Sequence, residues 1–194
     1  MDAAGQYGGQ PVHRELGNGV ARELGMSRMC VSHEVMEIRA SPAVRQRWEK
    51  AVCQDASDPV ALVGLAISLA PSDTTKLQEG GEAWTKEKLY LHALKQSDQW
   101  SLPFNNLAVS MRPRETVDIG DSRVMTREDL MAKAIALNSE CADYYNNLAT
   151  MLLQGAGDGF EQSGNEVANP SLLLRRAIEL QPRHAYALTN LALV

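Results

Sequence analysis

Apolar residues recur along the chain at three- and four-residue steps, the spacing that lines one face of an amphipathic helix. One such series is Phe104, Leu107, Ala108 and Met111. Stretches with this period predict helices over residues 58–69, 101–111 and 141–153. A more polar segment follows each stretch, so the pattern predicts separate helices rather than one long helix.

A second helix is predicted after each polar segment, and a capping residue marks its start. Threonine and asparagine oxygens accept hydrogen bonds from the unpaired N–H groups of a first helical turn. The predicted caps are Thr85, Thr126 and Asn169, the last of which is followed by proline at the first helical position. The pattern therefore predicts helix pairs.

These helix pairs repeat at a nearly constant interval. One marker is a Leu-Ala pair, whose leucines, Leu65, Leu107, Leu148 and Leu191, are separated by 42, 41 and 43 residues. A second marker is an alanine followed by an aliphatic residue, 14 residues before each leucine: Ala51, Ala93, Ala134 and Ala177. Two markers that keep one phase over four copies indicate a repeat array.

Small side chains in both series would let neighbouring helices approach closely. We expect the following residues to pack between helices: Ala93, Ala108, Ala134, Ala149, Ala177, Ala192, Leu107, Leu148 and Leu191. Alanine and leucine at these contacts are consistent with the low aromatic content of 5%.

The repeat divides the chain. Residues 1–12 are expected to be disordered, residues 13–57 to form a degenerate first repeat, and residues 58–194 to form the array. Its units are about 58–99, 100–140 and 141–183, with a partial unit at 184–194. Because the array stops within a first helix, we expect either further sequence or a covering partner, including self-association through that helix.

An insert separates the two helices of each unit. Residues 115–125 alternate apolar and polar on both sides of Gly120-Asp121, which predicts a β-hairpin with a two-residue turn. Looser hairpins are expected over residues 74–84 and 155–169. An isolated hairpin is marginally stable in water, so each should pack on its helices or on the next hairpin.

The stretch from Ala177 to Ala192, with Pro182 between the two helices, resembles the junction between two tetratricopeptide (TPR) repeats. The resemblance covers about residues 40–194 and implies a mainly α fold. The implied architecture is a right-handed α-solenoid of helix pairs, here with short β-hairpin inserts between the two helices of each repeat. The units are longer than the family's roughly 34 residues, and Sel1-like repeats, which are also longer, are the nearest alternative.

The three asparagines Asn106, Asn147 and Asn190 share one phase in successive first helices. Asparagine is a poor helix former, so its recurrence there needs a reason. The resemblance implies that the three face the concave groove as a ladder that binds a peptide backbone, since an amide both donates and accepts. Hydrogen bonds between neighbouring helices, or capping of the inserts, are the alternatives.

Three further residues complete this picture. Gly64 interrupts the asparagine series in the first well-defined unit. Asn105 and Asn146 are second candidates for the site and are expected to face the previous helix.

Charge and composition limit the partners. The chain has 19 Lys and Arg against 24 Asp and Glu, a net charge of −5, and no basic run that could neutralise phosphates. We therefore expect neither nucleic acid nor a membrane as partner, and no stretch reaches the roughly 18 apolar residues of a membrane span. The three dispersed cysteines and the lack of a signal sequence favour a soluble protein of the cytoplasm.

No catalytic or metal-binding pattern stands out in the sequence. The four histidines, His13, His33, His92 and His184, are scattered without ligand spacing, and the last two are expected on helix surfaces. The glycines match neither a phosphate loop nor a dinucleotide fingerprint. We expect a non-enzymatic protein-interaction scaffold without metal or cofactor; the alternatives are a recruiting or regulatory arm of a larger enzyme, such as a glycosyltransferase, and a self-associating structural array.

Overall fold

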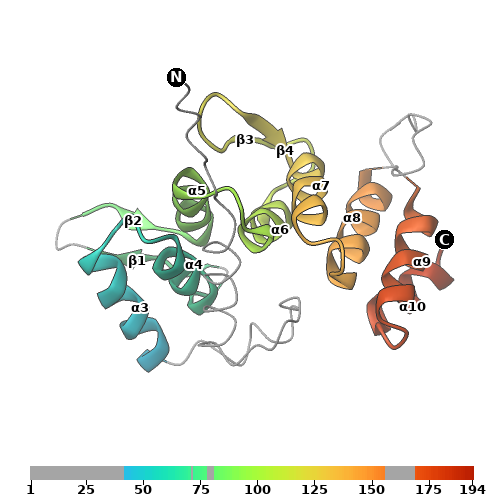
Figure 1. Cartoon of the computed structure of the whole chain (residues 1–194), viewed down its shortest axis with the longest axis horizontal. Helices are drawn as coiled ribbons and strands as arrows, with labels where there is room; N and C mark the ends of the chain where they lie inside the picture. Colours follow the sequence, from blue (N-terminus) through green and yellow to red (C-terminus); the bar gives the residue numbers. More distant parts are fainter. Residues whose placement is uncertain (1–41, 71, 78–80, 156–168) are drawn as a thin grey trace, which may run out of the picture.

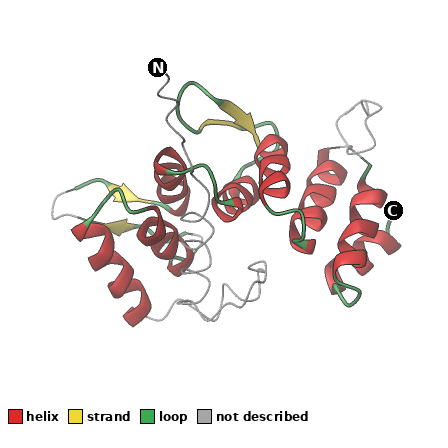
Figure 2. Ribbon diagram, in the orientation of Figure 1, coloured by secondary structure: helices red, strands yellow, loops and turns green. Residues whose placement is uncertain are grey.

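The computed structural model describes residues 42–70, 72–77, 81–155 and 169–194, and this part of the chain is mainly helical, as predicted (Figures 1 and 2). The expectations for residues 1–41, for the tip of the first hairpin at 78–80, and for residues 156–168 of the third insert lie outside the described residues.

The described helices lie close to the predicted ranges. In chain order they are α3 (Pro42–Gln54), α4 (Pro59–Ser68), α5 (Lys86–Gln96), α6 (Ser101–Ser110), α7 (Arg127–Leu137), α8 (Ala142–Gly155), α9 (Pro170–Leu180) and α10 (Ala185–Ala192). The bounds of α4, α6 and α8 differ from the predicted first helices by two residues at most.

The predicted helix caps are confirmed. The Thr85 hydroxyl accepts the Lys88 N–H at 3.3 Å, at the start of α5. Thr126 and Asp129 form a capping box at the start of α7, in which each side chain bonds the other residue's N–H. The Asn169 oxygen accepts two N–H groups of the first turn of α9. Such a cap stabilises a helix by about 1 kcal/mol.

Each helix packs against the next one in the chain, from α3 to α10, and α8 also contacts α10 (Figure 1). The apolar side chains between the helices form a single buried cluster. Its largest fully buried members include Leu62, Leu65, Leu89, Leu94, Phe104, Leu107, Leu130 and Met131. Since each fully buried side chain of this size contributes about 1.5–3 kcal/mol, contacts between neighbouring helices hold the described helices together.

The residues expected to pack between helices are mostly buried. Buried are Ala93, Ala108, Ala134, Ala149, Ala177, Leu107 and Leu148. Leu191 is half-buried, and Ala192 is exposed, contrary to the expectation. Both belong to α10, whose main contacts among the described elements are α9 and α8, so fewer helices cover it than cover α8.

Two of the predicted hairpins are present. Strand β1 (Thr75–Lys76) pairs antiparallel with β2 (Ala83–Trp84), and β3 (Thr116–Asp118) pairs antiparallel with β4 (Val124–Thr126).

The predicted turn of the second hairpin is wrong by one residue. Asp121 and Ser122 have φ of 54° and 56°, and the Arg123 N–H bonds the Gly120 carbonyl at 3.0 Å. These are features of a type I′ turn centred on Asp121-Ser122.

Each hairpin is attached to the unit that precedes it. In the first hairpin, the Thr75 hydroxyl donates to Glu49 of α3 at 2.6 Å. In the second, Arg123 pairs at 2.8 Å with Asp98, in the segment between α5 and α6, and Ile119 is 1% exposed. The hydrogen bond from Arg123 lowers the pKa of Asp98. The inserts therefore bridge consecutive units.

Gly64 is required by the packing of α3 on α4. A Cβ atom at this position would lie 2.5 Å from two ring carbons of Trp48, a side chain that is 5% exposed. The closeness of the two helices thus depends on the absence of a side chain at residue 64.

We predict that Gly64→Ala lowers the free energy of unfolding by about 1–3 kcal/mol, because Trp48 must move out of a close-packed site. Urea denaturation measures the change. The matched control is Gly155→Ala, since nothing lies within 4 Å of a Cβ there. Equal stability of the Gly64 variant and the parent would contradict the packing described here.

Candidate binding face

The asparagines lie where the first helices of successive units meet. Asn147 of α8 donates its side-chain N–H to the Asn105 oxygen of α6 at 3.0 Å. Asn190 of α10 donates in the same way to the Asn146 oxygen of α8, also at 3.0 Å. The equivalent bond thus occurs at two successive junctions, and it brings α6, α8 and α10 side by side.

Further bonds link the two asparagines of each pair. Asn105 donates to the Asn106 oxygen at 2.9 Å, and Asn106 donates to the Tyr90 hydroxyl of α5 at 2.9 Å. Asn146 donates to the Asn147 oxygen at 3.5 Å, the longest bond of the set. Burial without a partner would be costly for these amides, so their hydrogen bonds explain how they are tolerated mid-helix.

The predicted ladder residues differ in exposure. Asn106 is 5% exposed and uses both its oxygen and its N–H in the bonds above, whereas Asn147 and Asn190 are half-buried. Hydrogen bonds between neighbouring helices, one of the alternatives, are therefore present. Binding of a peptide backbone stays a prediction.

The second candidates, Asn105 and Asn146, are 4% and 8% exposed. Their oxygens accept from α8 and α10, so they face the following first helix. The expectation that they face the previous helix is wrong. The reason is that each junction pairs the first asparagine of one unit with the second asparagine of the next.

Two residues of this network were missed from the sequence. Tyr90 lies in a second helix, where its series otherwise holds apolar residues, and only its hydroxyl is polar. Thr150 lies one turn after Asn146 and accepts from Asn190 at 3.3 Å. The four-residue step from Asn146 was a signal for Thr150, whereas Tyr90 could be placed only by the packing of α5 on α6.

His184 is not on the surface, contrary to expectation, but 4% exposed at the start of α10. Its Nδ1 accepts the Ala187 N–H at 3.1 Å, as a helix cap. Nε2 lies 2.9 Å from Asp143 Oδ1 of α8. Because Nδ1 accepts, the ring proton of the neutral side chain is on Nε2 and is donated to Asp143. This pair attaches the start of α10 to α8.

His92 is half-buried and packs edge-on against Trp84, with ring centroids 5.3 Å apart. A buried charged side chain missed from the sequence is Arg127, which is 4% exposed. Its guanidinium donates to the Met151 carbonyl at 3.1 Å and pairs with Glu128 at 2.9 Å. It thereby bonds a backbone carbonyl near the end of α8.

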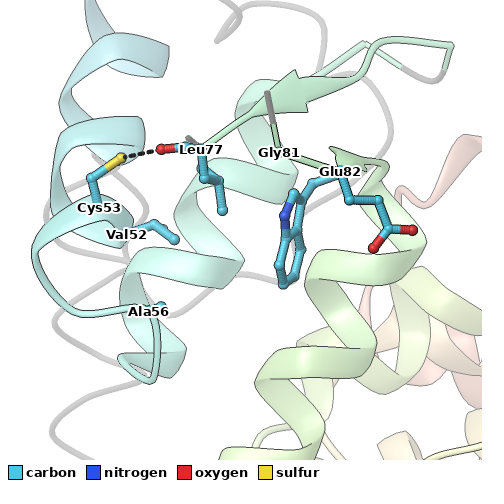
Figure 3. Close-up of a pocket in the computed structure, with 7 residues that line it drawn as sticks. Val52, Cys53, Ala56, Leu77, Gly81 and Glu82 are labelled. Carbon is cyan, nitrogen blue, oxygen red and sulfur yellow. Dashed lines mark hydrogen bonds between the residues drawn. The ribbon is translucent and has the colours of Figure 1, made fainter. Parts of the chain in front are cut away.

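A pocket of about 280 Å³ lies between α3 and the first hairpin (Figure 3). Val52, Cys53, Leu77 and Trp84 are among its lining residues, and the Cys53 thiol lies 3.0 Å from the Leu77 carbonyl.

In the part of the chain that the structure describes, no three His, Cys, Asp or Glu side chains gather as a metal site. None of the helices in those ranges has the length and apolar character needed to cross a membrane.

The cysteines differ from one another. Cys53 is a free, exposed thiol, whereas Cys141 is fully buried.

Comparison with known proteins adds no relative. Neither the models of known protein families nor the curated proteins give a match to this chain. The resemblance to tetratricopeptide repeats therefore rests on the residue pattern of this sequence.

Two buried tyrosines, Tyr90 and Tyr144, have raised pKa values. Burial raises the pKa of Tyr90, which bonds Asn106, well above its ordinary 10.0. Burial also raises the pKa of Tyr144, which bonds the Ser101 hydroxyl at 3.0 Å, to about 12. Both phenols therefore hold their protons more tightly in the folded than in the unfolded chain.

We predict that the free energy of unfolding falls between pH 10 and pH 12, since unfolded tyrosines ionise there and the two buried ones do not. The slope is about 1.4 kcal/mol per pH unit for each tyrosine. Urea denaturation at several pH values measures it. Tyr90→Phe should show a shallower slope and the exposed control, Tyr186→Phe, the parental one; a parental slope in Tyr90→Phe would contradict the prediction.

We predict that His184→Ala lowers the free energy of unfolding by about 1–2 kcal/mol, because it removes a helix cap and the donor to Asp143. Asparagine is a good cap residue, so His184→Asn should lose less. Urea denaturation at pH 7.5 compares the two variants. Equal losses would mean that the cap contributes nothing measurable.

Proposed function

We propose that this protein is a non-enzymatic interaction scaffold, a TPR-like solenoid that binds a peptide or protein segment along its concave face. The observation that carries the proposal is the repeated bond between first helices, Asn147 to Asn105 and Asn190 to Asn146. It aligns equivalent positions of three units in one row. A row of this kind can follow an extended ligand over several units.

The chemistry of this row suits a peptide backbone. Asn147 and Asn190 are half-buried, and a carboxamide can both donate to a carbonyl and accept from an N–H. Asn106, with its amide already engaged, would instead hold its neighbours in position. Val109, one turn after Asn105 and 46% exposed, adds an apolar contact for a ligand side chain.

The charge of the chain also bears on the ligand. With a net charge of −5, the protein favours a neutral or basic segment over an acidic one. The proposed ligand is therefore an extended peptide segment with apolar side chains and without clustered acidic residues.

We predict that Val109→Arg lowers the affinity for such peptides at least about tenfold, because a long charged side chain would cover the apolar contact. Peptides enriched on the parent protein from a random displayed library provide the ligands, and titration measures their affinity for each variant. The matched control is Val124→Arg, on strand β4, where the valine is 63% exposed. Enriched peptides that bind both variants as tightly as the parent, or a library without enrichment, would refute the proposed function.

A further inference from the structure

The side-chain bonds between the asparagines join end to end into one chain. It runs from Asn190 to Asn146, Asn147, Asn105, Asn106 and finally the Tyr90 hydroxyl, with lengths of 3.0, 3.5, 3.0, 2.9 and 2.9 Å. Each N–H that crosses between helices is donated to the earlier helix, and within each asparagine pair the first residue donates to the second. The chain passes through α10, α8, α6 and α5, and it therefore crosses both junctions between the first helices α6, α8 and α10.

Thr150 explains the direction of this chain. Its hydroxyl donates its single proton to the backbone carbonyl of Asn146 at 2.8 Å. Toward the side chain of Asn190 the hydroxyl can therefore only accept. Asn190 must therefore present its N–H groups to Thr150 and to the adjacent Asn146 oxygen. Because the side-chain oxygen of Asn146 accepts, its N–H groups remain to donate. Each following asparagine likewise accepts with its oxygen and donates with its N–H.

We propose that the five asparagines and Tyr90 act as one directed carboxamide chain, which fixes the register of α6, α8 and α10 and makes them open as one cooperative unit. This role concerns the coupling between units and does not depend on the proposed function. Both partners of each bond across a junction are at least half-buried. In such surroundings a hydrogen bond is stronger than in water, and successive bonds polarise one another.

The chemistry requires asparagine at each internal position. Every internal member donates once and accepts once, which aspartate, serine or leucine could not do at the same reach. A slip of α8 by one residue against α6 would place Leu148 or Asn146 opposite the Asn105 oxygen in place of Asn147. With Leu148 there, the buried oxygen would lose its donor, so that register is disfavoured.

The other polar bond between α6 and α8 is of a different kind. Ser101 and Tyr144 share one hydrogen bond at 3.0 Å, and it continues to no further side chain among the described contacts. It therefore stabilises the same junction without linking it to α10. This pair provides a matched control for the carboxamide chain.

The test is hydrogen exchange on the whole chain, comparing the slowest amides of α6 and α8. In the parent we expect them to exchange with protection factors within about threefold of each other, through a shared opening. The double variant Asn105→Leu/Asn147→Leu interrupts the carboxamide chain but keeps apolar contact. In it, the protection factors of the slowest α8 amides should be at least about tenfold lower than those of α6. In the control Ser101→Ala/Tyr144→Phe, the protection factors of α6 and α8 should decrease by the same factor. Equal losses in α6 and α8 of the leucine variant would overturn the proposal.

A second variant tests the chain where the leucine pair fails to fold. Asn147→Asp removes the donor to Asn105 when the carboxylate is charged, but a protonated carboxyl again donates once and accepts once. The difference in exchange between α6 and α8 should therefore be present at pH 7.5 and lost at low pH. Asn147→Leu, which cannot regain a donor, should keep the difference at both pH values. The same pH response in both variants would overturn the proposal.

Discussion

A buried carboxamide must find hydrogen-bonding partners inside the protein, and here those partners lie on helices more than 40 residues away in the sequence. Asn105 and Asn146 are almost fully buried, and each of their oxygens accepts from the next first helix. Because an unpaired amide in this position would be costly, the helices have few relative positions in which every amide is bonded. Apolar contacts between Leu and Ala faces would by themselves tolerate more sliding, since they are not directional.

The inserts add a second set of connections between units. The first hairpin bonds Glu49 of α3, and the second pairs Arg123 with Asp98 after α5. Each hairpin therefore reaches back to the unit before its own. Such a hairpin would be marginally stable alone, so its contact with the preceding unit contributes to the strands as well as to the array.

These connections have a consequence for the proposed binding face. A groove made from several helices holds an extended ligand best if its units already keep their spacing, since ordering them on binding would lower the affinity. The carboxamide chain and the hairpins both connect consecutive units. The exposed side chains that remain, such as Val109, can then serve binding without being needed for the fold.

The sequence by itself determined the helices, because the signals involved are local. The periodic apolar residues and the caps Thr85, Thr126 and Asn169 act within one or two turns, so their positions could be predicted closely. The hairpin at 115–125 was also predictable, although its turn lies one residue later than the glycine suggested, because Ile119 is drawn into the core.

Only the tertiary structure decided what the polar side chains do. The repeat marked the asparagines as special, but a ligand contact and a contact between helices leave the same periodic trace. His184, Arg127 and Tyr90 became buried because elements distant in sequence supply their partners: Asp143, the end of α8 and Asn106. Side-chain hydrogen bonding depends on distances of about 3 Å between such elements, and these are set by packing in three dimensions rather than by spacing along the chain.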